Sequence, residues 1–378
     1  MNLPEPLQQI NRTYVRVGKR KLSYFAGCDY FRLASHPKVL RATEEGLRKF
    51  GLNVAASRMT TGNHELYGKL EKSLAQFFGS ESATLVSNGY VTNLVVAQAL
   101  AGNFSHVLVD EKAHTSLRDA AQFFDCPILQ FKHRDPEDLA RVLSRIGTDA
   151  RPILLTDGMF SYDGSIAPLK SYLKILPGNA VLLVDDAHGA GTLGKTGKGT
   201  TELEGISRKR VIQTMTLSKA FGVYGGAILC SRELSKIILT SSRMFGGSTP
   251  LPLPLANAAL SAIQILRADK TLRRRLIQNV NEVKSELCNA GLEIAPAPSP
   301  LIAIIPETAR EAKRLKARCL ANGIFPSLIH YHGGPKNGYF RFAISSEHSE
   351  KQIAALIKTL SVSAGCNLEM EMHPLVAL

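Results

Sequence analysis

Residues 180–189 read AVLLVDDAHG: an apolar run ends in two carboxylates, which are followed by a histidine and a glycine. Strands this apolar, with little alternation, are typical of a sheet that is covered on both faces. Helix-like segments connect many runs of this kind, which predicts right-handed crossovers and a mostly parallel sheet. The other runs occupy 83–86, 106–109, 127–131, 152–155, 211–215 and 226–230.

The pattern changes after about residue 266, where longer helical stretches alternate with two further strands. Helices are predicted at 273–287 and 310–322, and strands at 301–305 and 339–344. A last helix is expected to begin after Ser349, whose hydroxyl suits an N-cap. We therefore predict an N-terminal segment (1–45), a large domain (46–270), a small α+β domain (271–363) and a tail (364–378).

The composition, 44% hydrophobic and 21% charged, is that of a globular protein. The six cysteines are scattered without a C-x-x-C pair, which predicts reduced thiols, a cytoplasmic protein and no metal site. The most apolar segment, 251–266, is broken by prolines and too short to span a bilayer, so we expect no membrane contact. The net charge of +14 favours solvated helix faces first and attraction of an anionic substrate second, and nucleic acid is not an expected partner.

Residues 189–196 match two nucleotide-binding patterns, G-x-x-x-x-G-K-S/T and G-x-G-x-x-G. Asp185 and Asp186 precede this loop, and a poor helix start follows it, so phosphate binding is disfavoured. We interpret the glycines as a flexible surface turn. A P-loop nucleotide-binding protein that uses Lys195 and Thr196 stays open as the alternative from a different functional class.

Chemically useful side chains follow the predicted strands, at the sheet edge where ligands bind in parallel sheets. Lys219 follows an apolar strand, and burial there lowers the pKa of an amine and frees it as a nucleophile; an ordinary surface lysine is the alternative. Asp185 ends a strand, where a carboxylate needs a cation such as a pyridinium nitrogen, or else caps a helix or binds a metal. His188 is placed to donate to a phenolic oxygen.

A strand-to-helix turn at Asn88, Gly89 and Tyr90 offers backbone amides that suit a phosphate group. His114 suits stacking on a cofactor ring or capping of the helix that follows it. Each of these signals is weak alone, and their succession along one sheet is the stronger argument.

Together these motifs resemble those of the α-oxoamine synthases, a fold-type-I family dependent on pyridoxal 5′-phosphate (PLP), over about residues 28–360. The resemblance implies an α/β, aspartate-aminotransferase-like fold with a large mostly parallel-sheet domain and a smaller α+β C-terminal domain. It implies Lys219 as the Schiff-base lysine, Asp185 on the pyridine nitrogen and His114 on the ring, as the three catalytic residues. Further implied PLP contacts are Asn88, Gly89, Tyr90, Ser161, His188, Thr216, Ser248 and Thr249.

The resemblance also implies a homodimer, because Ser248 and Thr249 match a stretch that reaches the phosphate of the neighbouring subunit. Arg341 matches the arginine that holds the substrate carboxylate, as a guanidinium fork can. Three residues depart from the family pattern and bear on the substrate rather than on the cofactor: Cys28, Tyr67 and Asp157.

The implied reaction is acyl transfer to carbon, a decarboxylative condensation of an amino acid with an acyl thioester. Chain length and overall pattern favour the branch that joins L-alanine to a pimeloyl group, carried by CoA or by acyl carrier protein, in biotin biosynthesis. Another branch, such as glycine C-acetyltransferase, is the nearest alternative. A member that binds PLP without condensing any substrate is a further one.

Overall fold

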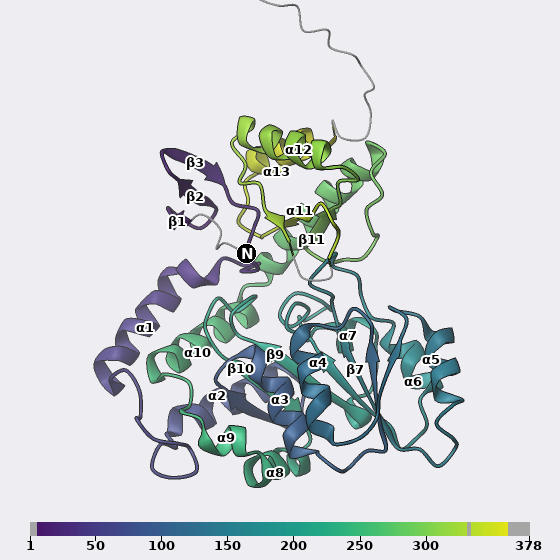
Figure 1. Ribbon diagram of the computed structural model, residues 1–378. Coiled ribbons are helices and arrows are strands. Elements are labelled where there is room, and N and C mark those ends of the chain that lie inside the picture. Colours follow the sequence, from purple (N-terminus) through teal and green to yellow (C-terminus); the bar gives the residue numbers. More distant parts are fainter. Residues whose placement is uncertain (1–5, 331–333, 362–378) are drawn as a thin grey trace, which may run out of the picture.

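The apolar runs form one seven-stranded sheet in the computed structural model, which describes residues 6–330 and 334–361 (Figure 1). The spatial order of the strands is β4-β10-β9-β8-β7-β5-β6. Every pairing from β9 to β6 is parallel, and β10 runs antiparallel to both of its neighbours, so the mostly parallel sheet is confirmed. The strands are β4 (Ser82–Val86), β5 (His106–Asp110), β6 (Ile128–Phe131), β7 (Pro152–Asp157), β8 (Val181–Asp185), β9 (Val211–Thr216) and β10 (Gly226–Cys230).

Both faces of this sheet are buried, which explains why its strands lack alternation in the sequence. Leu155 and Leu183 pack beneath α3, α4 and α8 on one face, while Leu154 and Leu182 pack with α5 and α6 on the other. The helices of this larger unit are α1 (Pro37–Phe50), α2 (Glu65–Phe78), α3 (Gly89–Ala99), α4 (Thr115–Ala121), α5 (Pro136–Leu143), α6 (Leu169–Ile175), α7 (Thr200–Leu203), α8 (Arg232–Ser241), α9 (Arg243–Gly247) and α10 (Leu253–Ala268).

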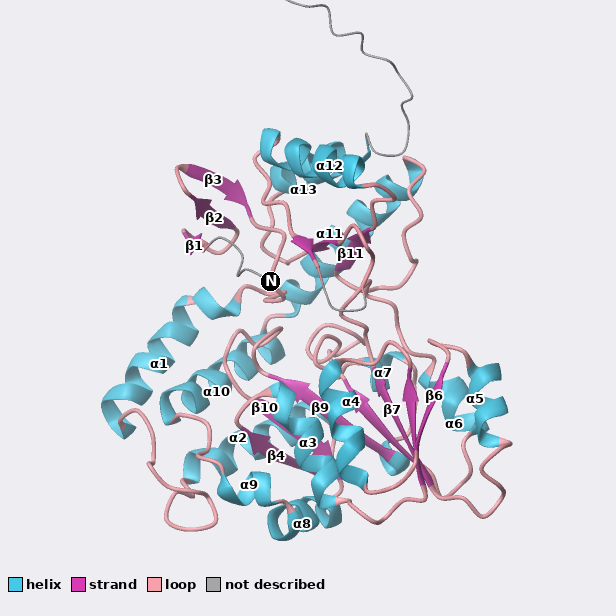
Figure 2. Cartoon of the chain, viewed as in Figure 1, coloured by secondary structure: helices cyan, strands magenta, loops and turns pink. Residues whose placement is uncertain are grey.

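A smaller unit lies above the carboxyl ends of the parallel strands (Figure 2). Its antiparallel sheet has the order β11-β13-β12, and three helices pack with it. The predicted cap is confirmed, since the Ser349 hydroxyl accepts a hydrogen bond from the Gln352 amide at 3.3 Å. The elements are α11 (Lys270–Asn289), β11 (Leu301–Ile304), α12 (Ala309–Ala321), β12 (Leu328–Ile329), β13 (Tyr339–Ala343) and α13 (Glu350–Ser361).

An N-terminal antiparallel sheet of β1 (Gln8–Gln9), β2 (Tyr14–Val17) and β3 (Arg20–Ser23) lies beside the smaller unit (Figure 1). The amide of Ala343 donates to the carbonyl of Phe25 at 2.6 Å, which ties β13 to the chain just after this sheet. The segment therefore hydrogen-bonds to residues more than 300 positions further along the chain. The domain boundary at residue 45 stays a prediction.

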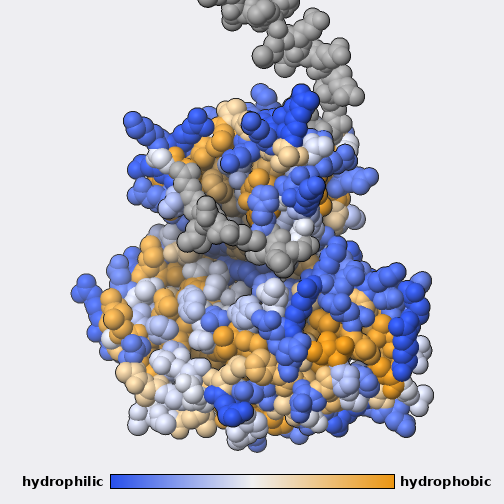
Figure 3. Space-filling model, in the orientation of Figure 1, coloured by the Kyte–Doolittle hydropathy of each residue, from blue (hydrophilic) through white to orange (hydrophobic). Residues whose placement is uncertain are grey.

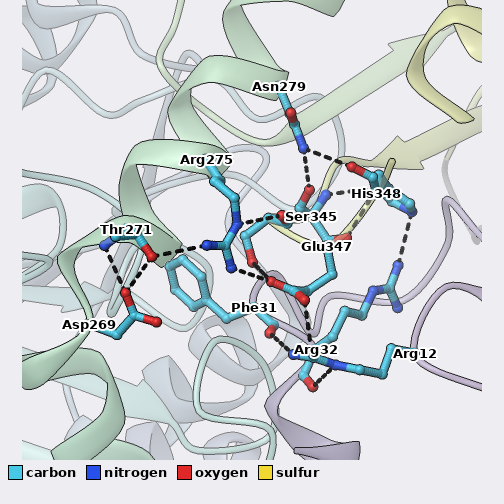
Figure 4. A network of polar contacts seen from close by, with 11 residues as sticks. Arg12, Phe31, Arg32, Asp269, Thr271, Arg275, Asn279, Ser345, Glu347 and His348 are labelled. Carbon is cyan, nitrogen blue, oxygen red and sulfur yellow. Dashed lines mark hydrogen bonds and ion pairs between the residues drawn. The ribbon is translucent and has the colours of Figure 1, made fainter. Parts of the chain in front are cut away.

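A polar network joins the two ends of the chain to the start of α11 (Figure 4). Glu347 forms ion pairs with Arg12 at 2.7 Å and with Arg275 at 2.6 Å. The neighbouring His348 is almost fully buried, and burial lowers its pKa to about 3. This histidine is neutral at physiological pH, and its Nε2 lies 3.0 Å from the carbonyl of Tyr24.

The described helices include none that is long and apolar enough to cross a membrane. The apolar segment 251–266 forms most of α10, which packs against α1 and α2. The predicted tail, 364–378, lies outside the described residues.

Candidate active site

A cavity of about 240 Å³ opens at the carboxyl ends of the parallel strands. It gathers every predicted PLP contact except Ser161, Ser248 and Thr249. Its lining is Asn88, Gly89, Tyr90, His114, Ser116, Asp157, Asp185, Ala187, His188, Thr216, Ser218 and Lys219.

Asp185 is 5% exposed, and three donors hold its carboxylate in the cavity wall. They are the Asn93 amide nitrogen at 2.7 Å, the Ala187 backbone amide at 3.0 Å and the Ser116 hydroxyl at 3.3 Å. Asn93 is fully buried, and its own side-chain oxygen accepts a hydrogen bond from Thr214 at 2.7 Å. This arrangement stabilises a negative charge of fixed orientation. Asn93 was not predicted as a site residue, although a buried amide in an otherwise apolar helix is a usable signal.

Asp157 lies directly opposite Asp185 in the register of β7 and β8. Burial, and then the negative charge of Asp185, raises the pKa of Asp157 well above its usual range. Both effects favour the protonated form of the Asp157 carboxyl group. Its side chain also accepts a hydrogen bond from the backbone amide of His114 at 2.8 Å.

Lys219 lies in the loop after β9 and is half-buried. Burial lowers the pKa of its amine, and the positive charge of Arg341 acts in the same direction. The nearby carboxylate of Asp185 opposes this shift without cancelling it. Within the described ranges no carboxylate lies within ion-pair distance of Lys219, so the amine is not neutralised as a salt bridge.

Two histidines line the cavity in different ways. The Nδ1 atom of His114 accepts from the Ser116 amide at 3.2 Å, so His114 caps α4 as one of the two predictions for it has it. The same residue also lines the cavity. Its ring lies edge-on to Tyr90, with centroids 6.1 Å apart. His188 is almost fully buried, with its Nδ1 atom 2.7 Å from the Tyr30 hydroxyl. Burial, and then the charges of Lys219 and Arg341, lowers the pKa of His188 well below its usual value.

The amino terminus of α3 opens onto the same cavity. Asn88 caps the helix by accepting from the Val91 amide at 3.1 Å. A Cβ atom at Gly89 would lie 2.7 Å from the Cβ of Thr216, so this close approach requires glycine. The cavity wall thus offers a helix terminus for a phosphate, a carboxylate for a cationic ring nitrogen and an amine for an aldehyde, a set that fits PLP.

The sequence of the whole chain matches a known family over almost the same span as the motifs. The family model described as aminotransferase class I and II covers residues 28–360. The chain belongs to this family. Its cofactor is accordingly PLP, and its relatives place it with the PLP-dependent acyltransferases of the α-oxoamine synthase type.

Three relatives of this chain match it over most of its length. The 8-amino-7-oxononanoate synthase of Thioalkalivibrio sulfidiphilus is 35% identical over 350 residues, which are 92% of this chain and 89% of the relative. A solved serine palmitoyltransferase from S. paucimobilis, with a bound PLP–myriocin aldimine, is 26% identical with a TM-score of 0.88, over 94% of this chain and 90% of that one. The solved 8-amino-7-oxononanoate synthase of Francisella tularensis is 27% identical with a TM-score of 0.78, over 90% and 97%.

Four predicted site residues lie outside the cavity wall of this family member. Arg341, on β13, reaches from the smaller unit to the larger one, and its Nη1 donates to the Ser161 backbone oxygen at 2.9 Å. Ser161 therefore meets the predicted substrate arginine through its main chain. Ser248 and Thr249 follow α9 and line a separate, smaller recess.

The glycine loop that matches the P-loop pattern is bound to carboxylates of the same chain. The backbone amides of Thr196 and Lys198 donate to Glu202 at 3.0 Å, and the Thr200 amide donates to Asp186 at 2.8 Å. Within the pattern, the amides of Gly191, Thr192 and Leu193 donate to backbone oxygens of the same chain. Most donors that would hold a phosphate are therefore already used, and the structure gives no support to the P-loop alternative. The expected surface turn is also wrong in part, because Gly189 and Gly191 of this pattern are buried.

Proposed function

We propose that the chain condenses L-alanine with a pimeloyl thioester, releasing CO2 and the free thiol and forming 8-amino-7-oxononanoate for biotin biosynthesis. The observation that carries this proposal is the 35% identity, over 350 residues, with an 8-amino-7-oxononanoate synthase. The cavity supports it, because its residues suit an amino-acid substrate bound to PLP.

In this proposal, different cavity residues bind different parts of PLP. When bound, PLP supplies an electron sink for the negative charge that develops at the substrate Cα. Asp185 would hold the ring nitrogen in its protonated form, and His114 would contact the ring. The α3 terminus, with Thr216, would hold the phosphate.

Lys219 moves the proton at the substrate Cα. Its lowered pKa leaves more of the amine unprotonated, as a general base requires. Arg341 binds the substrate carboxylate, and its contact with Ser161 keeps the guanidinium beside the cavity. The positive charge of Arg341 also favours the neutral amine of Lys219.

The working unit in this proposal is a cytoplasmic homodimer in which Ser248 and Thr249 bind the phosphate in the partner's cavity. Their separation from the cavity of their own chain supports this.

Two apolar side chains in the loop after α1 are proposed as part of the dimer interface. Leu52 is 70% exposed and Met59 is 52% exposed. Figure 3 shows hydrophobic residues reaching the surface of the larger unit. Light scattering is expected to give twice the chain mass, and Leu52→Asp with Met59→Asp to lower it; a wild-type monomer would contradict the dimer.

A thiol-release assay tests the reaction. Purified protein loaded with PLP is given alanine, glycine or serine, each with pimeloyl, acetyl or palmitoyl thioesters of CoA and of acyl carrier protein. We expect thiol release and CO2 formation with alanine and a pimeloyl thioester, and 8-amino-7-oxononanoate by mass spectrometry. Turnover confined to glycine with acetyl-CoA would replace the proposal with the glycine branch.

Serine with a palmitoyl thioester is the second candidate, because serine palmitoyltransferase structures superpose with a TM-score of 0.88. Turnover confined to that pair would favour it. PLP binding without any turnover would instead identify a non-condensing member.

A further inference from the structure

Tyr30 approaches the cavity from behind His188, on the chain that follows the N-terminal sheet. Its hydroxyl lies 2.7 Å from the Nδ1 atom of His188, and the two side chains are 1% and 6% exposed. The position is fixed from the smaller unit, since the Ser346 amide donates to the Tyr30 carbonyl at 2.9 Å. Tyr30 does not line the cavity itself, so it acts there only through His188.

The direction of this hydrogen bond follows from the protons that each group can hold. Burial raises the pKa of Tyr30 well above its usual value, so the phenol keeps its proton. His188 is neutral, because burial and the charges of Lys219, Arg341 and His114 all lower its pKa. A neutral imidazole has one N–H donor and one acceptor nitrogen.

Two groups beside the Tyr30 hydroxyl can accept its proton in a hydrogen bond. They are the Nδ1 atom of His188 and the side chain of Cys28. A thiol sulfur is a weak acceptor, whereas a neutral imidazole nitrogen is a strong one. Tyr30 therefore donates to Nδ1, and the imidazole proton must reside on Nε2.

We propose that Tyr30 is a positioning residue that fixes His188 as its Nε2–H tautomer, so that an N–H donor faces the cavity beside Lys219 and Asp185. This inference rests on the proposed role of His188 as a donor to the phenolic oxygen of PLP. The opposite tautomer would turn a nitrogen lone pair toward that oxygen and repel it. Tyr30 thus links the smaller unit and the N-terminal segment to the electronics of the cofactor site.

Nitrogen-15 NMR of the cofactor-free protein tests the tautomer without any activity measurement. Protein labelled at histidine is compared with the His188→Gln variant, which identifies the His188 signals. We expect a protonated Nε2 and an unprotonated Nδ1 in the wild type. A proton on Nδ1 in the wild type overturns the proposal, and this outcome leaves the proposed condensation reaction untouched.

The Tyr30→Phe variant tests the effect on the cofactor site. We expect mixed tautomer signals for His188, PLP affinity weaker by about three- to tenfold, and a shifted pH titration of the visible absorbance. Tyr24→Phe is the matched control, because this half-buried tyrosine lies in the same segment and is expected to leave all three readouts unchanged. Unchanged His188 signals together with an unchanged absorbance titration in Tyr30→Phe would also overturn the proposal.

Discussion

Lys195 and Lys219 each stand in a loop after a parallel strand, and each completes a motif that is typical of a functional lysine. Lys195 is exposed, and the neighbouring Thr196 gives its backbone amide and its hydroxyl to Glu202. Lys219 is half-buried in a cavity wall that also contains Asp185 and Asp157.

The two loops differ in the groups around the lysine that are available to bind a ligand. The amides of the glycine loop donate to backbone oxygens and to the carboxylate of Glu202 in the same chain, so the loop is a closed structural unit. The loop of Lys219 opens on a cavity, with a lowered amine pKa and no described ion pair. The motif that marks the site is the one whose lysine shares a cavity wall with the buried side chains of Asp185 and Asp157.

The two lysines should give the largest contrast in function. Lys219→Ala is expected to abolish the visible absorbance near about 420 nm and to lower condensation by at least about 10³-fold, because the nucleophile and the base are lost together. Lys195→Ala should keep both properties. Absorbance spectra and thiol release measure the effect, and a coloured, active Lys219→Ala protein would remove the basis of the comparison.

The adjacent carboxylates Asp185 and Asp186 sharpen the same contrast through pH. Burial raises the pKa of Asp186 to about 6. Because the native state then holds this proton to a higher pH than the unfolded chain, the contribution of Asp186 to stability is full in acid and is lost as the pH rises from about 4 to 6. The loss amounts to about 3 kcal/mol.

Asp186→Asn should remove this pH dependence. Urea unfolding at several pH values between 4 and 7 gives the free energy of unfolding of both proteins. The difference between variant and wild type is expected to change with pH. The exposed Asp149→Asn is the control and should follow the wild type. Parallel curves for wild type and Asp186→Asn would show that the buried carboxyl does not titrate in this range.

The smallest expected effect concerns the support of Asp185. Asn93→Ala removes a donor 2.7 Å from the Asp185 carboxylate, and a lost hydrogen bond to a charged group corresponds to about tenfold in activity. The exposed Asn103→Ala, in the turn that follows α3, is the control. Thiol release under saturating substrate measures both variants, and equal rates would show that the other two donors suffice to hold Asp185.

The sequence predicts the larger unit well because its signals are local. Each strand of the large sheet is a continuous apolar run, and polar residues at the strand ends are sufficient to locate the cavity. The glycine loop misleads because its pattern is local too, while the carboxylates that bind it, Asp186 and Glu202, are recognised only in three dimensions.

The residues that sequence reasoning missed act over long distances in the chain. Tyr30 meets His188 across 158 positions, and Asn93 meets Asp185 across 92, so no spacing rule reveals either contact. The N-terminal sheet did have a local signal, since Val15 is buried between exposed or half-buried neighbours in β2. Short strands at the start of a chain give too few alternations for a firm prediction.

The hydrogen bond between Ala343 and Phe25, with the ion pair between Glu347 and Arg12, sets an order for folding during synthesis. Arg12 and Phe25 find these partners late, because the partners are translated more than 300 residues after them. Nascent chains commonly fold from the amino terminus onward. The seven-stranded sheet can therefore form before the smaller unit that lies above it. The hydrogen bond from the Ser346 amide to the Tyr30 carbonyl belongs to the same late set, so the backbone that carries the partner of His188 is completed only after the smaller unit has been translated.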